Sequence, residues 1–216
     1  MFKRAPGYFD VTTYTGTGGA HDTAPLTVNH NLGVAPELII VKDRDRTKDW
    51  KVWTTSIGDT QLGNLNGTPN AAWASDFEIK DVTATNFKVG TDGAFTSTNH
   101  NGDDFVAYLF ATRPGVSKVG TYQGNNGTTT IDIDCGFTNG ARFVLIKDTT
   151  YTGDWYVWDS VRGIVSGTDP ILKINTTDTE LLSSDWIDPL SSGFQVSTAG
   201  TTVNSLNHTY LFLAIA

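Results

Sequence analysis

An internal repeat constrains the fold of this chain more than any other feature of its sequence. The stretch KDRDRTKDWKVW at residues 42–53 returns 105 positions later as KDTTYTGDWYVW at residues 147–158. The segment FVAYLFA at 105–111 returns at the same spacing as YLFLAIA at 210–216. Strands must keep their register whereas loops tolerate insertions, so constant spacing at apolar segments is typical of a duplicated fold. The sequence therefore predicts two modules related by internal duplication.

Between these segments the spacing of the repeat varies, as expected where loops differ in length. Tyr14-Thr15-Gly16 matches Tyr122-Gln123-Gly124, and we pair Asn99-His100 with Asn207-His208, both at a spacing of 108. Pro114 and Gly115 interrupt the chain after the first copy. The predicted organisation is an N-terminal segment at 1–7, module 1 at 8–112, a linker at 113–116 and module 2 at 117–216.

Short β-type runs separated by turn residues fill both modules. In TIDIDCGF, for example, Ile131, Ile133 and Cys135 share one face of a strand, and the aspartates share the other. A helical pattern is limited to one or two turns within 70–81. About seven short strands per hundred residues predict an all-β fold of two tandem β-sandwich, jelly-roll-like modules. The expected strands are 9–15, 26–30, 37–42, 50–54, 77–80, 86–89 and 105–110, then 119–122, 129–134, 142–147, 155–159, 171–174, 193–197 and 209–215.

Charge and cysteine content exclude several classes of function. The net charge is −8, and the longest basic run is Lys3-Arg4, so the sequence predicts no nucleic-acid partner. The lone Cys135 excludes an internal disulfide or a cysteine zinc site. The first ten residues lack the apolar segment of a signal peptide, and we find no run of about 18 apolar residues, so we expect no membrane insertion.

The repeated Asp-Trp-x-Val-Trp motif supplies the candidate binding residues. Two tryptophans three positions apart in a strand point to opposite faces, so one can be core while the other faces outward. An outward tryptophan could stack on the apolar face of a sugar, and the preceding aspartate could bind it or shape a turn. We favour packing for most of these side chains. The candidate ligand-binding residues are Trp50, Trp53, Trp155, Trp158, Asp49 and Asp154.

Neither catalysis nor metal binding is predicted. The acidic stretch from Asp43 to Asp49 is interleaved with basic residues and lacks the glycine and terminal glutamate of an EF-hand. The four histidines have no metal-ligand spacing, and there is no GxSxG motif. Paired carboxylates for glycoside hydrolysis stay open, because the fold sets their geometry. We predict no catalytic residue, no metal ligand and no cofactor.

Four segments together resemble a tandem β-rich region of tailed-phage virion proteins, found in tail fibre proteins of marine and environmental phages. These segments are RAPGYFDVTTYTGTGG at 4–19, VNHNLGVAPELIIVKDR at 28–44, GDWYVWDSVRGI at 153–164 and PLSSGFQV at 189–196, completed by YLFLAIA. The resemblance covers nearly the whole chain. In such proteins the region often follows a longer N-terminal part, whereas this sequence starts at Met1.

The resemblance implies a non-enzymatic structural component of the virion. It implies a tail-fibre or appendage module that contributes to attachment to bacterial surface glycan, with other virion proteins as partners and a homo-oligomer, a trimer by analogy with phage fibres. A capsid decoration or head-fibre protein is the first alternative, and a polysaccharide-degrading appendage enzyme is the second. In each case the expected location is the virion, assembled in the host cytoplasm.

Overall fold

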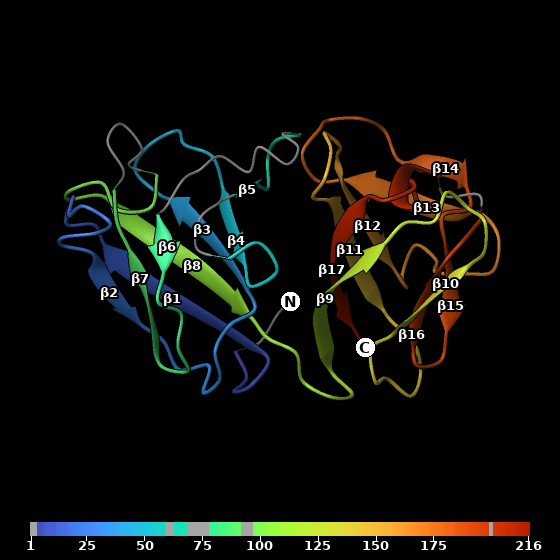
Figure 1. The fold of residues 1–216 in the computed structure, drawn as a ribbon, viewed down its shortest axis with the longest axis horizontal. Helices are drawn as coiled ribbons and strands as arrows, with labels where there is room; N and C mark the ends of the chain where they lie inside the picture. Colours follow the sequence, from blue (N-terminus) through green and yellow to red (C-terminus); the bar gives the residue numbers. More distant parts are fainter. Residues whose placement is uncertain (1–3, 59–62, 69–77, 92–96, 199–200) are drawn as a thin grey trace. The chain divides into compact units, whose positions relative to one another are not determined.

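The chain folds into two β-sandwich units, seen in a computed structural model whose described residues are 4–58, 63–68, 78–91, 97–198 and 201–216. The boundary between the units falls between Ala111 and Thr112. Strands β1 to β8 belong to the first, called unit 1, and β9 to β17 to the second, called unit 2 (Figure 1). All named strand pairs are antiparallel. The predicted all-β class is confirmed.

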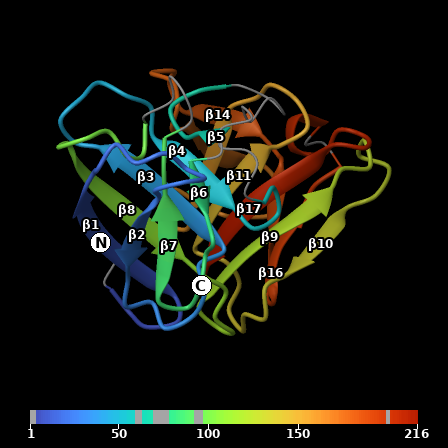
Figure 2. The same ribbon diagram turned by 60° about the vertical axis from the view of Figure 1, so that its left-hand side comes forward.

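In unit 1 a five-stranded sheet and a three-stranded sheet enclose an apolar core. The larger sheet has the order β1-β8-β3-β4-β5 and the smaller one β2-β7-β6, and Figure 2 shows the smaller sheet in front of the larger. Alternate residues of the central strands, such as Ile39 and Val41 of β3, enter the core, as the two-residue period of a strand requires. The strands are β1 Phe9–Thr15, β2 Leu26–Asn29, β3 Leu38–Asp43, β4 Lys51–Thr54, β5 Gly63–Asn64, β6 Ile79–Lys80, β7 Asn86–Val89 and β8 Asp104–Phe110.

Unit 2 repeats this arrangement with one additional edge strand. Its six-stranded sheet has the order β9-β17-β11-β12-β13-β14, and its three-stranded sheet has the order β10-β16-β15. A short 3-10 helix at Thr201–Val203 precedes the last strand. The strands are β9 Ser117–Gln123, β10 Ile131–Asp134, β11 Phe143–Asp148, β12 Trp155–Asp159, β13 Asp169–Lys173, β14 Leu181–Ser184, β15 Ile187–Leu190, β16 Gly193–Val196 and β17 Thr209–Ile215.

The two units therefore share one topology. In each, the first strand pairs with the last and the second with the next to last, β1 with β8 and β2 with β7, then β9 with β17 and β10 with β16. This nested pairing wraps the chain as in a jelly roll. Duplication of one ancestral sequence stays a prediction, and the common strand order is structural support for it.

Each predicted strand overlaps a strand of the structure, and four of them (9–15, 86–89, 155–159 and 209–215) have the predicted bounds. The sequence did not predict β5, β14 or β15. Pro189 lies within β15, and proline is accommodated there because β15 is an edge strand of its sheet. The short helix considered for 70–81 lies largely outside the described residues, and its last part, Ile79–Lys80, is strand β6.

The predicted linker is in fact the first turn of unit 2. The N–H of Val116 donates to the carbonyl of Arg113 at 2.9 Å, and Gly115 has a φ of 73°. Unit 1 begins with the same turn, in which Tyr8 donates to Ala5 at 3.2 Å around a Pro-Gly pair. Proline followed by a glycine of positive φ defines a type II turn. Equivalent turns therefore begin both units. They lie in the segments 1–7 and 113–116, which the sequence predicts to be separate from the modules.

The structure also corrects one match in the repeat. The side-chain oxygen of Asn99 accepts a hydrogen bond from the N–H of Thr17 at 2.9 Å, and that of Asn204 accepts one from Asn125 at 2.8 Å. Asn99 therefore corresponds to Asn204 and not to Asn207. The spacing is 105 here too, so the segment before the last strand has kept its length. A shared Asn-His dipeptide caused the wrong match.

Candidate functional site

The two tryptophans of each motif lie on opposite faces of their sheet, as their spacing predicts. Trp53 and Trp158 point inward and belong to the cores of unit 1 and unit 2. Trp50 precedes β4 and lines the other face of the five-stranded sheet, where it is half-buried. Of the four candidate tryptophans, Trp50 alone has an accessible side chain.

The second copy of the motif differs at this point. Trp155, the counterpart of Trp50, is only 1% exposed. The expectation of an outward, accessible tryptophan in each copy is therefore wrong for module 2. Spacing in the sequence shows which face a side chain takes, but it does not show whether that face is covered.

The aspartates before Trp50 and Trp155 hold a turn. Asp49 accepts hydrogen bonds from the side-chain amides of Asn64 and Asn66, at 3.0 and 2.9 Å, while Asn66 in turn accepts the N–H of Trp50 at 2.9 Å. In unit 2, Asn175 donates to Asp154 at 2.8 Å and accepts from the N–H of Trp155 at 2.9 Å. The Asp-Trp dipeptide persists because this Asn-Asp bridge anchors the start of the strand.

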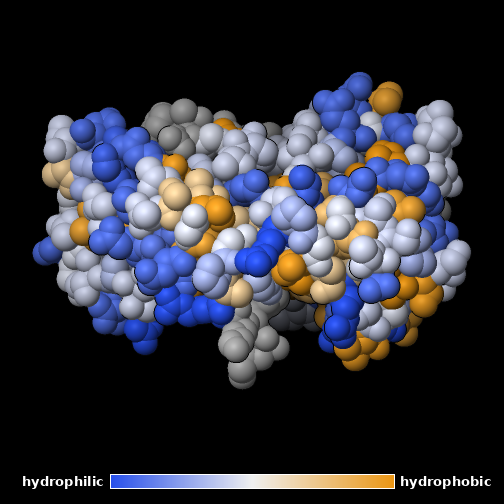
Figure 3. Space-filling model, turned by 90° about the horizontal axis from the view of Figure 1, so that it is seen from below, coloured by the Kyte–Doolittle hydropathy of each residue, from blue (hydrophilic) through white to orange (hydrophobic). Residues whose placement is uncertain are grey.

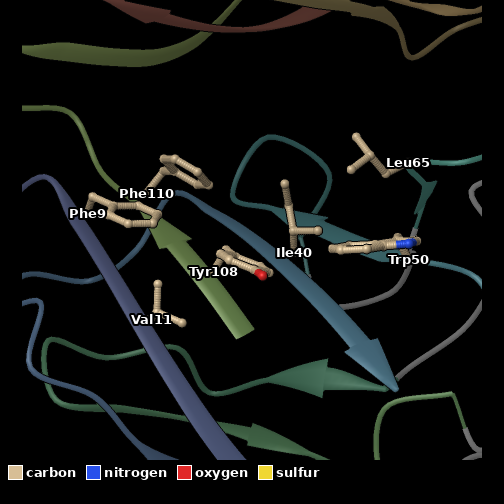
Figure 4. Close-up of a pocket in the computed structure, with 7 residues that line it drawn as sticks. All are labelled: Phe9, Val11, Ile40, Trp50, Leu65, Tyr108 and Phe110. Carbon is tan, nitrogen blue, oxygen red and sulfur yellow. The ribbon is translucent and has the colours of Figure 1, made fainter. Parts of the chain in front are cut away.

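An aromatic pocket surrounds Trp50 on the outer face of the unit 1 sheet (Figure 4). Its volume is about 360 Å³. The rings of Trp50 and Tyr108 stack with their centroids 6.2 Å apart and their planes inclined by 25°. The register of the strands brings the lining residues together, because Ile40 lies opposite Tyr108, and Phe9 lies opposite Phe110. The seven lining residues are Phe9, Val11, Ile40, Trp50, Leu65, Tyr108 and Phe110.

The chemistry of this Trp50 pocket is almost wholly apolar. None of its seven lining residues is charged, so the Tyr108 hydroxyl and the Trp50 indole N–H are its side-chain polar groups. The surface shown in Figure 3 differs from this apolar lining, because its hydrophobic residues are mixed with hydrophilic ones. Such a pocket suits an apolar group or the apolar face of a ring. It contains no pair of carboxylates for hydrolysis.

Charged side chains gather instead at the end of β3 and of β11, where they shape loops. In unit 1 the Arg46 guanidinium bridges Asp43, at 2.8 Å, and Asp103. In unit 2 the equivalents of these three residues are Tyr151, Asp148 and His208. His208 Nδ1 lies 2.6 Å from Asp148 Oδ2, and the Tyr151 ring stacks on the imidazole at 4.3 Å. Both versions place a nitrogen-bearing side chain against one inward aspartate that caps a turn.

The structure also shows the roles of Cys135 and of the acidic stretch after Lys42. The Cys135 side chain is buried in the core of unit 2, as its strand pattern predicts, and burial raises the pKa of its thiol to about 12. The acidic stretch after Lys42 is a turn in which Asp43 accepts the N–H groups of Asp45 and Arg46, both at 3.0 Å. Within the described part of the chain, no three His, Cys, Asp or Glu side chains are grouped to hold a metal ion.

The fold defines an all-β protein of two β-sandwich units, and unit 1 carries the aromatic Trp50 pocket. The chain belongs to the family described as "Domain of unknown function (DUF7483)", which matches residues 4–216 and so includes both units. Neither the curated proteins nor the solved structures contain a match to the chain. No helix within the described residues has the length and apolar character needed to cross a membrane.

Proposed function

We propose that this protein is a non-enzymatic structural component of a bacteriophage virion, a tail-fibre or appendage module that contributes to attachment to surface glycan. The sequence resemblance supports the virion role. The Trp50 pocket carries the binding role, because its stacked Trp50 and Tyr108 rings are half-buried on the sheet. Aromatic faces of this kind stack on the apolar faces of sugar rings. Several weak sites on one particle would add up to firm attachment.

The binding role is tested with an array of bacterial surface polysaccharides and the purified chain. We expect binding to at least one polysaccharide, and a loss of at least about tenfold in affinity for Trp50→Ala, since aromatic anchors dominate such contacts. Tyr151→Ala is the control, because Tyr151 is an accessible aromatic residue, 55% exposed, that lies outside the pocket. Equal loss in both variants, or no binding by the wild type, contradicts a glycan site at Trp50.

A purely structural role as a capsid decoration or head fibre is the second candidate. One observation favours it: apart from one hydroxyl and one indole N–H, the side chains that line the pocket are apolar, which suits an apolar side chain of another virion protein. Gold-labelled antibody against the chain, viewed on intact particles by electron microscopy, distinguishes the two roles. Label at tail or fibre tips supports attachment, and label over the capsid supports decoration.

A further inference from the structure

The aromatic lining of the Trp50 pocket is not a requirement of the fold that the two units share. Its rings are those of Phe9, Trp50, Tyr108 and Phe110. At three of these four strand positions unit 2 carries side chains without a ring, namely Ser117, Leu213 and Ile215. The fourth, Trp155, is only 1% exposed. Because unit 2 forms the same strand pairs without rings at these places, the rings of unit 1 are available for a ligand.

The two ends of the pocket differ in chemistry (Figure 4). In the sheet order β1-β8-β3-β4-β5, Phe9 lies on β1, whereas Trp50 lies directly before β4. Beside Trp50, the Asp49 carboxylate accepts hydrogen bonds from the side-chain amides of Asn64 and Asn66, at 3.0 and 2.9 Å. Asp49 and Asn66 are exposed, so their polar groups can bind the hydroxyl groups of a sugar. The Trp50 end of the pocket therefore has a polar rim.

The β1 end of the pocket is lined by hydrocarbon side chains. Phe9 and Phe110 are 4% and 6% exposed, and their ring centroids lie 4.9 Å apart. Val11, two residues further along β1, is half-buried. None of these three side chains has a polar atom, so a sugar hydroxyl placed against them would lose hydrogen bonds to water without replacement. Removing a methyl group from water is favourable there. The pocket thus suits a ligand with hydroxyl groups on one side and a methyl group on the other.

We propose that the sugar bound by the Trp50 pocket is a 6-deoxyhexose, whose C6 methyl group contacts Phe9 and Phe110 while its ring lies on Trp50 and Tyr108. This inference rests on the proposed glycan-binding function of the pocket. An N-acetyl sugar also ends in a methyl group, but the amide N–H and carbonyl beside that methyl each need a hydrogen-bond partner. The lining side chains offer the Tyr108 hydroxyl as the one polar group next to the β1 end. The 6-deoxyhexose is therefore the better match.

The experiment compares sugars that differ only at C6. L-Rhamnose and L-mannose form one such pair and L-fucose and L-galactose another, with a methyl group in the first member and a hydroxymethyl group in the second. Titration of the full chain, followed by saturation-transfer NMR, measures each affinity. We expect at least one 6-deoxy sugar to bind at least about fivefold more tightly than its partner, since an apolar pocket disfavours an added hydroxyl by up to about a hundredfold, and a pocket open to solvent does so by less. Its C6 methyl protons should receive the strongest saturation.

A substitution at the β1 end tests where the methyl group lies. Val11→Thr exchanges a methyl group for a hydroxyl of similar size, so it should remove most of the preference for the 6-deoxy sugar. Val106→Thr is the matched control, because Val106 is also half-buried and lies on the same face of the sheet, two residues before Tyr108, but outside the pocket. Thermal unfolding of both variants shows that they fold. An equal preference for the 6-deoxy sugar in the two variants overturns the proposed position of the methyl group.

Two negative results have different meanings. The 6-deoxyhexose is overturned, and glycan attachment stands, if Trp50→Ala abolishes binding to a polysaccharide but L-mannose, L-galactose or N-acetylglucosamine binds as tightly as the 6-deoxy sugars. If no sugar or polysaccharide shows binding that depends on Trp50, the proposed function is wrong and this inference is wrong with it.

Discussion

The ammonium nitrogen of Lys147 lies 2.9 Å from the backbone carbonyl oxygen of Gly153 and 2.9 Å from that of Asp148, so the loop after β11 closes around a positive charge. Lys42 in unit 1 does the same, with donor distances of 2.6, 3.2 and 2.9 Å to the carbonyl oxygens of Asp43, Arg46 and Lys48. Each lysine occupies its loop as a bound cation would. The Lys-Asp pair therefore persists in both repeats while the loop residues between Lys-Asp and Asp-Trp change.

This buried ammonium group predicts a particular pH dependence of stability. Burial lowers the pKa of Lys147 to about 8, against the nearby charges of Asp148 and Asp154. Between that value and the ordinary value of 10.5, the unfolded chain binds more protons, so stability rises with pH. We expect the free energy of unfolding of the wild type to increase by up to about 3 kcal/mol over this window, relative to Lys147→Met.

Urea unfolding of both proteins at several pH values from 7 to 10.5 checks this expectation. Other groups titrate in the same range, and the difference between the two proteins removes their contribution. Parallel pH profiles of the wild type and Lys147→Met would show that the amine is not buried in a charged form.

Strand positions could be predicted from the sequence because apolar alternation and turn residues are local signals. Phe9–Thr15 and Trp155–Asp159 were predicted to the residue. The three strands that were missed, β5, β14 and β15, all lie at sheet edges and carry weak local signals. Gly63–Asn64 has only two residues, Leu181–Ser184 has little apolar alternation, and Ile187–Leu190 contains a proline that an edge strand tolerates.

The sites were harder to predict, because accessibility depends on what covers a face. The sequence pattern of Trp50 and Trp155 is the same, yet one is half-buried and the other fully buried. The Trp50 pocket also needs Phe9 and Phe110 from distant strands, which only the register brings together.

Comparison of the two repeats predicts that one destabilising substitution in unit 1 is compensated by a second substitution. Arg46 in unit 1 bridges two aspartates, whereas unit 2 has Tyr151 in place of Arg46 and His208 in place of Asp103. Arg46→Tyr should remove the positive charge between Asp43 and Asp103, while His100 Nδ1 stays 2.9 Å from Asp103 Oδ2. The free energy of unfolding should fall by roughly 2–3 kcal/mol, less than for a fully buried pair. Adding Asp103→His should recover at least half of the loss.

Urea unfolding of the single and double variants measures this coupling. Arg44→Tyr serves as the control, because Arg44 is exposed and a surface change of this kind stays within about 0.5 kcal/mol. If the double variant is no more stable than Arg46→Tyr, the positions are not interchangeable between the units.

Close backbone packing predicts which glycine tolerates a side chain. A methyl group at Gly193 would lie 2.0 Å from the carbonyl oxygen of Ile133, on the neighbouring strand. The backbone cannot yield there without breaking the pairing of β10 with β16, so Gly193→Ala should cost about 3 kcal/mol. Gly153→Ala, whose nearest contact is 3.7 Å away, should cost less than about 1 kcal/mol. Equal Tm values for the two variants would contradict this packing.

The rate at which the Cys135 thiol is labelled should report how often unit 2 opens. Cys135 is 4% exposed, and burial raises its pKa to about 12, so at pH 8 almost none of it is the reactive thiolate in the folded state. We expect Ellman's reagent to label native protein at least about a hundred times more slowly than protein in 8 M urea. The labelling rate should rise with Gly193→Ala, because that change loosens the strand beside Cys135, and should not change with Trp50→Ala in unit 1. Rapid labelling of the native wild type would place the thiol outside the core.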